Sequence, residues 1–500
     1  MRIMSGLICT LVLAPHAAMG ADLKAVDRWR AAHEPAIIGQ LDELVRMRSV
    51  AADPKGLAAT ATRLEGLLKA RGFSTSQLTI PGAPPLVTGT LLTQGAQRTV
   101  TFYAHYDGTP VTPSQWQSAP FAPVMRDGAR TVDWKAAKAP FNRDWRFYGR
   151  AAADDKAGIV AFLAAFDALK AGGQKPSVNL KVVWEGEEER SSPHLTELMR
   201  LHAKALRSDL WLIGDGPLHQ SRTPTLYFGT RGMMPAEATI YGPLRPLHDG
   251  HYGNWAPNPA VMAAELIASL RDSEGNIRIL GFADDVAPLS QAARAAIAAL
   301  PPVEAALKKE FALPRSEGRE GLTASTMRPA LNIRGMSAGG VGAASTASIP
   351  SEASISMDFR IVPGQTPERV RQKVEAFLIA HGWKIVRQAP DATMRAAHPK
   401  LIKLVWGGGY VAQRTDMSAP AAKAAIAAGT SAAGKPVVQL PMMGASVPLS
   451  MIKKQFGVPL IGLPISNHDN NQHTADENIR LGNLWDGIRL YAAMIANLSW

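Results

Sequence analysis

The sequence predicts an α/β protein: a mostly parallel sheet flanked by helices, interrupted by an inserted α+β domain. Three apolar segments in the first half of the chain predict buried strands, and they cover residues 99–104, 178–184 and 210–213. Apolar residues at helical spacing follow Asp154-Asp155, between the first and second of these strands. Alternation of strand and helix is typical of a parallel sheet with helices on both faces.

The pattern changes after about residue 222. Residues 225–241 indicate a pair of strands, residues 353–360 alternate like a strand with one exposed face, and residues 368–381 indicate a helix. Past about residue 396 the alternation of helix and apolar strand resumes. We therefore expect a leader at residues 1–21 and a main domain in two parts, at residues 22–222 and 396–500. The inserted domain is expected between these parts, at residues 223–395.

The first 21 residues have the features of a secretory signal peptide. Arg2 supplies the positive charge, residues 7–14 form a short apolar core, and small residues stand near residue 20. Cys9, the only cysteine, lies in this segment, so the mature chain has no disulfide. No later apolar run is long enough to cross a bilayer. We expect a periplasmic or secreted protein without a membrane span.

The formal charge of the chain is +12, from 54 Lys and Arg against 42 Asp and Glu. A basic chain raises the question of nucleic-acid binding. The basic residues are scattered, however, and form no stripe interleaved with aromatic residues. We therefore expect no nucleic-acid partner.

Polar side chains follow all three predicted strands of the main domain. His105 and Asp107 follow the first, a run of four glutamates within residues 185–189 ends the second, and Asp215 follows the third. Because the carboxyl ends of parallel strands meet at one edge of a sheet, these side chains are expected to converge. Glutamates so close together repel one another unless water or a cation offsets their charge.

Two further segments carry candidate metal ligands. Asp154 and Asp155 precede a predicted helix, where an isolated acid is most often a cap. His468 and His473 lie in a polar segment near the C-terminus. With the strand ends, these residues form a donor set suited to two metals that share a carboxylate. Adjacent glutamates can supply one metal ligand and one general base.

The order of these five motifs resembles a family of co-catalytic zinc exopeptidases and amidohydrolases. That family includes carnosinase-like dipeptidases, glutamate carboxypeptidase, aminoacylase and succinyl-diaminopimelate desuccinylase, and the resemblance covers nearly the whole mature chain. It implies a hydrolase with two divalent metal ions, with zinc expected and manganese or cobalt as alternatives. It also implies that the inserted domain is a lid and the contact surface of a homodimer.

The resemblance assigns roles to individual residues at the metal site. Asp154 would bridge the two metals, its peptide bond to Asp155 would be cis, and His473 is preferred to His468. The implied metal ligands are His105, Asp154, Glu189, Asp215 and His473.

The resemblance also implies residues that act on the substrate. Glu188 would be the general base, and Asp107 would orient His105. His248, or alternatively His251, would donate a hydrogen bond to the carbonyl of the scissile bond, often across a dimer. The substrate carboxylate would be bound by Arg360 and by the loop that contains Ser446.

The sequence leaves the substrate open within one reaction class. We expect cleavage of an amide bond beside a free carboxylate, by a dipeptidase or carboxypeptidase, with an N-acyl amino acid amidohydrolase as the alternative. A protein that binds metal or peptide without catalysis is a remote alternative. Residues 335–339 match the Gly-x-Ser-x-Gly pattern of serine hydrolases, but the glycines that follow make a poor helix start, so we expect a turn there.

Overall fold

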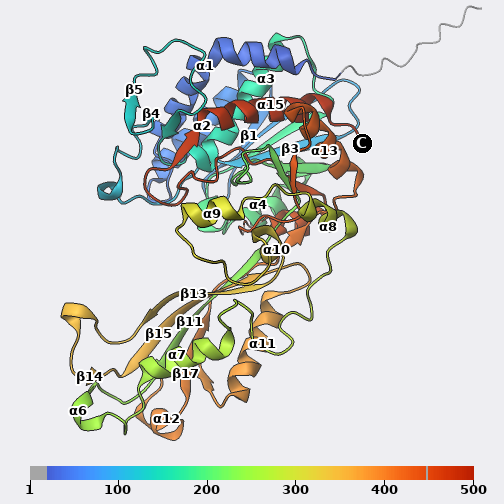
Figure 1. The fold of residues 1–500 in the computed structure, drawn as a ribbon. Helices are drawn as coiled ribbons and strands as arrows, with labels where there is room; N and C mark the ends of the chain where they lie inside the picture. Colours follow the sequence, from blue (N-terminus) through green and yellow to red (C-terminus); the bar gives the residue numbers. More distant parts are fainter. Residues whose placement is uncertain (1–19, 446, 448) are drawn as a thin grey trace, which may run out of the picture.

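The computed structural model describes residues 20–445, 447 and 449–500. The described chain has two large sheets: the eight-stranded one lies with most of the helices at one end of the molecule, and the five-stranded one extends away from it (Figure 1). Residues 1–19 of the expected signal peptide, and Ser446, lie outside the described residues. None of the described helices has the length and apolar character needed to cross a membrane.

The larger sheet has eight strands in the order β1-β2-β7-β3-β8-β20-β9-β19. Its centre is parallel, from β7 through β3 and β8 to β20, and antiparallel pairing joins β1 to β2, β2 to β7 and β20 to β9. The mostly parallel sheet predicted from the sequence is confirmed. The strands are β1 (Ser74–Leu78), β2 (Leu86–Leu91), β3 (Thr99–His105), β7 (Asn179–Glu185), β8 (Leu210–Ile213), β9 (Thr225–Tyr227), β19 (Val438–Leu440) and β20 (Leu460–Gly462).

Helices cover both faces of the larger sheet, as its buried strands require. Along β3, Phe102 packs with α3 and α15 on one face, whereas Tyr103 joins a second apolar cluster on the other. The first face is covered by α1 (Leu23–Arg46), α2 (Pro54–Lys69), α3 (Ala157–Ala171), α13 (Pro420–Ala433) and α15 (Leu481–Asn497), and the second by α4 (Leu195–Leu201) and α14 (Ser450–Phe456), with α5 (Ala203–Leu206) following α4.

A four-stranded antiparallel sheet joins distant parts of the main domain. In it β21, near the C-terminus, pairs with β6, and β6 pairs with β4. This pairing ties the polar segment that carries His473 to the region before Asp154. The strands are β4 (Val124–Asp127), β5 (Arg130–Val132), β6 (Arg146–Tyr148) and β21 (Asn478–Arg480).

The smaller sheet forms the core of the lid domain and has the order β13-β15-β11-β17-β16. Its apolar face packs against α7 and α11. The short elements β14 and α6 lie at the end farthest from the larger sheet (Figure 1), and β12 pairs with β14. The elements are β11 (Gly232–Tyr241), β12 (Leu247–His248), α6 (Asp249–Tyr252), α7 (Pro259–Leu270), β13 (Ala330–Ser337), β14 (Ser348–Ile349), β15 (Glu352–Ile361), α11 (Pro367–Ala380), β16 (Lys384–Val386), α12 (Ala392–Ala397) and β17 (Leu401–Trp406).

The junction between the domains differs in detail from the sequence prediction. β17 lies beyond residue 396, where the main domain was expected to resume, yet it pairs with β11 in the lid sheet. Conversely, α8 precedes β13 in the chain but packs against the main domain through Ala293. The expected boundaries stay a prediction, and this pairing favours a return to the main domain after β17. The remaining elements are α8 (Gln291–Ala298), α9 (Glu304–Glu310), α10 (Leu322–Thr326), β10 (Gly229–Thr230) and β18 (Gln413–Arg414).

The Gly-x-Ser-x-Gly segment does not form a nucleophile elbow. Ser337 ends β13, where it pairs with Ser354 of β15, and the next helical turn in the described chain is the short one at 342–344. An elbow needs a sharp turn from a strand directly into a helix. Residues 335–337 therefore end a lid strand, and the turn expected over the whole segment is limited to the residues after Ser337.

Candidate active site

His105 ends β3 and is fully buried at the edge of the larger sheet. Its Nε2 lies 2.9 Å from Asp154 Oδ1, and its Nδ1 lies 3.2 Å from the backbone oxygen of Asp107 and 3.3 Å from Asp107 Oδ1. Burial lowers the pKa of the His105 imidazole, but hydrogen bonds with Asp107 and Asp154 outweigh it, and the pKa lies well above its usual value. Asp107 thus orients the imidazole while Nε2 faces the site.

Asp154 lies in an irregular turn just before α3, and its peptide bond to Asp155 is cis, as predicted. The buried carboxylate of Glu477 holds this turn. It accepts hydrogen bonds from the backbone N–H of Ala153 at 2.9 Å and of Asp154 at 3.0 Å, and from Arg150 Nη1 at 2.8 Å. Glu477 is therefore a positioning residue, a role that was not predicted from the sequence. Its place directly before β21, four residues after His473, is the signal that could have found it.

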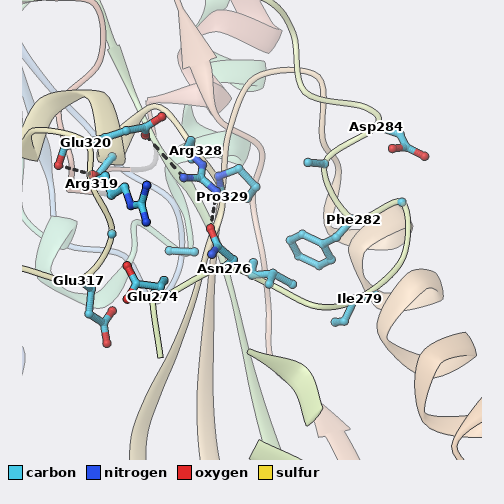
Figure 2. A pocket seen from close by; sticks show the side chains of 17 residues that line it. Glu274, Asn276, Ile279, Phe282, Asp284, Glu317, Arg319, Glu320, Arg328 and Pro329 are labelled. Atoms are coloured by element: carbon cyan, nitrogen blue, oxygen red, sulfur yellow. Dashed lines mark hydrogen bonds and ion pairs between the residues drawn. The ribbon is translucent and has the colours of Figure 1, made fainter. Parts of the chain in front are cut away.

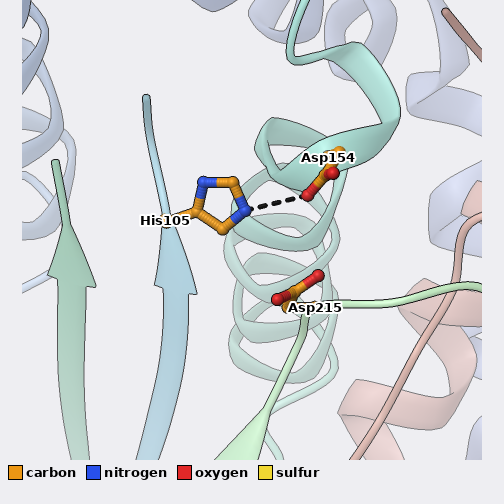
Figure 3. Close-up of side chains that lie close together, drawn as sticks. All are labelled: His105, Asp154 and Asp215. Atoms are coloured by element: carbon orange, nitrogen blue, oxygen red, sulfur yellow. Dashed lines mark hydrogen bonds and ion pairs between the residues drawn. The ribbon is translucent and has the colours of Figure 1, made fainter. Parts of the chain in front are cut away.

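Asp215 follows β8 and completes a first group of possible metal ligands (Figure 3). One ligand atom from each of His105, Asp154 and Asp215 lies within 4.8 Å of the others. Burial and the nearby Asp154 raise the pKa of the Asp215 carboxyl to about 7. The ends of two neighbouring strands thus converge with the turn before α3, as the parallel sheet predicted.

A second group shares Asp154 with the first. Ligand atoms of Asp154, Glu189 and His473 also lie within 4.8 Å of one another. His473 Nε2 lies 3.0 Å from Glu189 Oε2 and 3.2 Å from Asp154 Oδ2. The structure therefore brings all five expected ligands together and places Asp154 between the two groups, as a bridging ligand must be.

The donor chemistry of the two groups fits two divalent cations. Together they offer two imidazoles and three carboxylates, a set that suits zinc, manganese or cobalt. Burial, followed by the charge of neighbouring acids, raises the pKa of Glu188 and of Glu189. Cations at this place would offset the repulsion among these acids. The role of each residue as a ligand stays a prediction.

Asp107 also fixes the glutamate turn. Its two carboxylate oxygens each accept a backbone N–H, from Glu188 and from Glu189, both at 3.2 Å. The side chains of Glu188 and Glu189 therefore leave a turn whose backbone is held by hydrogen bonds to Asp107. Glu189 then reaches His473, and the carboxyl of Glu188 lies near enough to Asp215 for that acid to raise its pKa.

The other two glutamates of the run are structural. Glu185 is buried and accepts a hydrogen bond of 2.6 Å from the hydroxyl of Tyr103. Glu187 is also buried, and its carboxylate accepts the backbone N–H of His194 at 2.9 Å. The run therefore combines two glutamates at the site with two that hold the chain around it.

The expected substrate-binding residues lie outside the two ligand groups. Arg360, on β15 of the lid domain, donates from Nε to Asp358 Oδ2 at 2.6 Å. His248 and His251 are exposed at the far end of the lid, with ring centroids 4.7 Å apart, so this chain does not bring its own His248 to the metal ligands (Figure 1). His468 is not in either group of ligand atoms, and its Nε2 lies 3.8 Å from Glu310 Oε2 of α9. This agrees with the preference for His473.

The fold and the site define a metal-dependent peptidase. Residues 101–497 match the model of peptidase family M20/M25/M40, and the chain belongs to this family. The expectation drawn from the order of the motifs is thereby confirmed.

Known members of the family resemble the chain over most of its length. The Cys-Gly metallodipeptidase DUG1 of Candida albicans is 26% identical over 91% of this chain and 93% of its own. The Beta-Ala-His dipeptidase of Homo sapiens is 25% identical over 91% of this chain and 85% of its own. A succinyl-diaminopimelate desuccinylase of Acidovorax ebreus is 27% identical over 58% of each chain. The solved structure of the dipeptidase Dug1p from Saccharomyces cerevisiae has the same fold, with a TM-score of 0.76, 22% identity and coverage of 96% of this chain and 99% of that one.

Proposed function

We propose that the chain is a dipeptidase that uses two zinc ions to hydrolyse the peptide bond of a dipeptide with a free C-terminal carboxylate. The observation that carries this proposal is the position of Asp154, which belongs to both groups of ligand atoms while Glu188 stands beside them. The relatives aligned over most of the chain are dipeptidases, which supports the choice within the family.

The residues of the site account for the steps of hydrolysis. Bound divalent cations would polarise the carbonyl and lower the pKa of the attacking water. Glu188 accepts the proton from that water and then passes it to the leaving amine, a double role that its raised pKa favours. Asp107 keeps Glu188 and His105 in fixed positions relative to each other, since its carboxylate contacts the backbone N–H of Glu188 and the imidazole of His105.

An N-acyl amino acid amidohydrolase is the second candidate. It needs the same water, base and carboxylate contact and differs only in the acyl group that it accepts. The similarity to a desuccinylase over 58% of the chain favours keeping this candidate.

Location and assembly are part of the proposal. We propose export to the periplasm or the exterior, because residues 1–21 have the features of a signal peptide. A homodimer through the lid domain is proposed because His248 lies far from the chain's own ligands. Mass spectrometry of the exported protein would detect cleavage near residue 21, and an uncleaved N-terminus would contradict export by this signal.

The decisive experiment measures amine release from dipeptides, longer peptides and N-acyl amino acids. The purified protein is assayed after chelation and again after zinc or manganese is restored, with Glu188→Gln as the control. Metal-dependent release from dipeptides would support the dipeptidase, whereas preference for N-acyl amino acids would support the second candidate. A protein that binds two metals and cleaves none of the panel would contradict both.

A further inference from the structure

Arg231 is a buried arginine at the junction of the two domains. It follows β10, precedes β11 and is 7% exposed. Its backbone N–H donates to the oxygen of Ala445 at 3.2 Å, and its Nη2 donates to the backbone oxygen of Arg328 at 3.0 Å. Its Nε is buried and has no hydrogen-bond partner among the described residues. A buried guanidinium donor without a partner is costly, so a ligand that accepts from it would be stabilising.

The charges around Arg231 do not balance. Burial, followed by the nearby Arg360, lowers the pKa of the Arg231 guanidinium to about 10, and Asp358 opposes this shift. Asp358 gives one carboxylate oxygen to Arg360, and its other oxygen is buried without a partner among the described residues. Among the described residues, the charged groups that shift the pKa of Arg231 are the guanidinium of Arg360 and the carboxylate of Asp358, and the three groups together carry one net positive charge that a single carboxylate of a ligand would neutralise.

Short contacts connect Arg231 to the metal-binding edge of the larger sheet. Gly216, directly after Asp215, packs against Met443, since a Cβ there would lie 2.8 Å from the Met443 sulfur. The backbone N–H of Met443 donates to the oxygen of Gly229 at 2.8 Å, and Met443 forms a β-bridge with Thr230, the residue before Arg231. The guanidinium of Arg231 is therefore linked through Met443 to the segment after β8 that carries Asp215.

We propose that Arg231 binds the substrate's free carboxylate together with Arg360, and that it thereby restricts the enzyme to substrates with an unblocked C-terminus. The open Nε and the fixed Nη2 present one edge of the guanidinium for a paired contact with a carboxylate. The inference rests on the proposed function, which it deepens by assigning a second arginine to the carboxylate.

The test compares a dipeptide with its C-terminal amide in wild type, Arg231→Met and Arg231→Lys. Removing the guanidinium should raise KM for the dipeptide by roughly 10- to 100-fold, because a charge-assisted hydrogen-bond pair is lost. KM for the amide should change by less than about threefold, because the amide offers no charge to bind. Arg231→Lys should recover only part of the loss, since an ammonium cannot form the paired contact.

Arg328→Met is the matched control. The backbone oxygen of Arg328 contacts Arg231, but the Arg328 side chain is exposed and directed into a surface pocket (Figure 2). There it donates to Asn276 Oδ1 at 3.0 Å and lies 3.6 Å from the carboxylate of Glu320. This variant removes a guanidinium near Arg231 while leaving the backbone oxygen that Arg231 contacts. KM for the dipeptide should stay within about twofold of wild type, since exposed ion pairs contribute little.

Binding measurements separate this inference from the proposed function. Calorimetric titration of the metal-loaded protein with the dipeptide and its amide needs no turnover. A wild-type preference for the acid that Arg231→Met abolishes would support the inference even if no peptide is cleaved, and in that case only the proposed function fails. Equal losses of affinity for acid and amide in Arg231→Met would overturn the inference and leave Arg231 as a structural link between the domains. If Arg231→Met does not fold, an acid preference in Arg231→Lys equal to that of wild type would overturn it as well.

Discussion

At the scale of single residues, one carboxylate organises the reacting groups. Asp107 contacts the imidazole of His105 with one oxygen and accepts the backbone N–H groups of Glu188 and Glu189 with both. Any displacement of Asp107 therefore moves the expected metal ligand His105 and the proposed general base Glu188 together. This explains how two adjacent glutamates with similar surroundings can serve different purposes: the turn sends Glu189 to His473 and leaves Glu188 beside Asp215.

Replacing Glu188 by glutamine should abolish turnover without loss of metal. The amide keeps the shape of the side chain but cannot accept the proton of the attacking water, so kcat should fall by roughly 100- to 10,000-fold. Metal content, measured by elemental analysis, should match wild type because the five expected ligands remain. Glu187→Gln is the control, since Glu187 only supports the turn through His194. Near-normal turnover in Glu188→Gln would remove this residue from the mechanism.

Metal uptake should release protons and should weaken as the pH falls. Hydrogen bonds with Asp154 and Glu189 raise the pKa of His473 to about 11, and the pKa of Asp215 is raised to about 7. A raised pKa means that each group keeps its proton up to a higher pH, and a cation must displace that proton to bind. Affinity should therefore decline most steeply below about pH 7, where Asp215 also takes up a proton.

Calorimetry in buffers of different ionisation enthalpy would count the protons released by metal uptake. His468→Ala is the control, because His468 lies beside Glu310 and should not affect the count. If His473→Ala released as many protons as wild type, His473 would not be a ligand.

Residues that act through local motifs were predictable from the sequence, and residues that act through distant contacts were not. The parallel sheet predicted that His105, the glutamate run and Asp215 converge, because each follows a strand, whereas Asp154 and His473 were assigned through the resemblance to the family. Glu477 holds a turn more than 320 residues away in the chain, and the partner of Arg231 lies 97 residues beyond it. Such pairings depend on how the sheets pack, which no local pattern encodes.

At the scale of elements, the segment that carries His473 is held by β21 and by one partly buried ionic cluster. Asp469 accepts hydrogen bonds from Arg146, on β6, and from Arg480, at the end of β21. Burial alone would raise the pKa of Asp469, but the hydrogen bonds with Arg146 and Asn467 outweigh it and hold the pKa well below its usual range. The cluster therefore couples the four-stranded sheet to the position of His473, an expected metal ligand.

Asp469→Asn should destabilise the fold at neutral pH and have less effect in acid. Because the folded pKa is lowered, the ionised carboxylate stabilises the fold above its unfolded pKa of about 4, and that contribution is lost as the pH falls through the folded value. The expected loss of unfolding free energy at pH 7 is about 1–3 kcal/mol, as for a hydrogen bond to a charged group. Urea denaturation of the metal-free protein at pH 7 and at about pH 2 measures the difference, because most of the contribution is lost only as the pH approaches the lowered folded pKa.

Asp486→Asn is a suitable control for the electrostatic argument. Asp486 pairs with Arg143 at 2.7 Å, but both side chains are about half exposed. Its loss should cost less than about 1 kcal/mol, as for a surface ion pair. Equal costs for Asp469→Asn at the two pH values would show that its effect comes from packing and not from charge.

At the scale of the whole molecule, the lid domain places a functional candidate beyond the reach of its own site. His248 lies with β12, β14 and α6 at the end of the lid farthest from the larger sheet (Figure 1). Two-fold symmetry would let each lid reach the site of the other copy, because any contact made by one copy is repeated by its partner. The proposed homodimer thus gives an exposed histidine a purpose that a single chain does not.

Mixing two inactive variants tests this arrangement directly. Glu188→Gln lacks the base, and His248→Ala lacks the proposed hydrogen-bond donor to the carbonyl, so each alone should be strongly impaired. If the donor comes from the partner, random reassembly makes half of the dimers mixed, and one site of each mixed dimer has both groups intact. The mixture should then recover about one quarter of wild-type turnover, whereas unmixed samples recover none. Single variants are the controls, and light scattering verifies that the dimers have exchanged. Exchanged dimers without recovery would place the function of His248 within its own chain, whereas normal turnover of His248→Ala alone would place it outside catalysis.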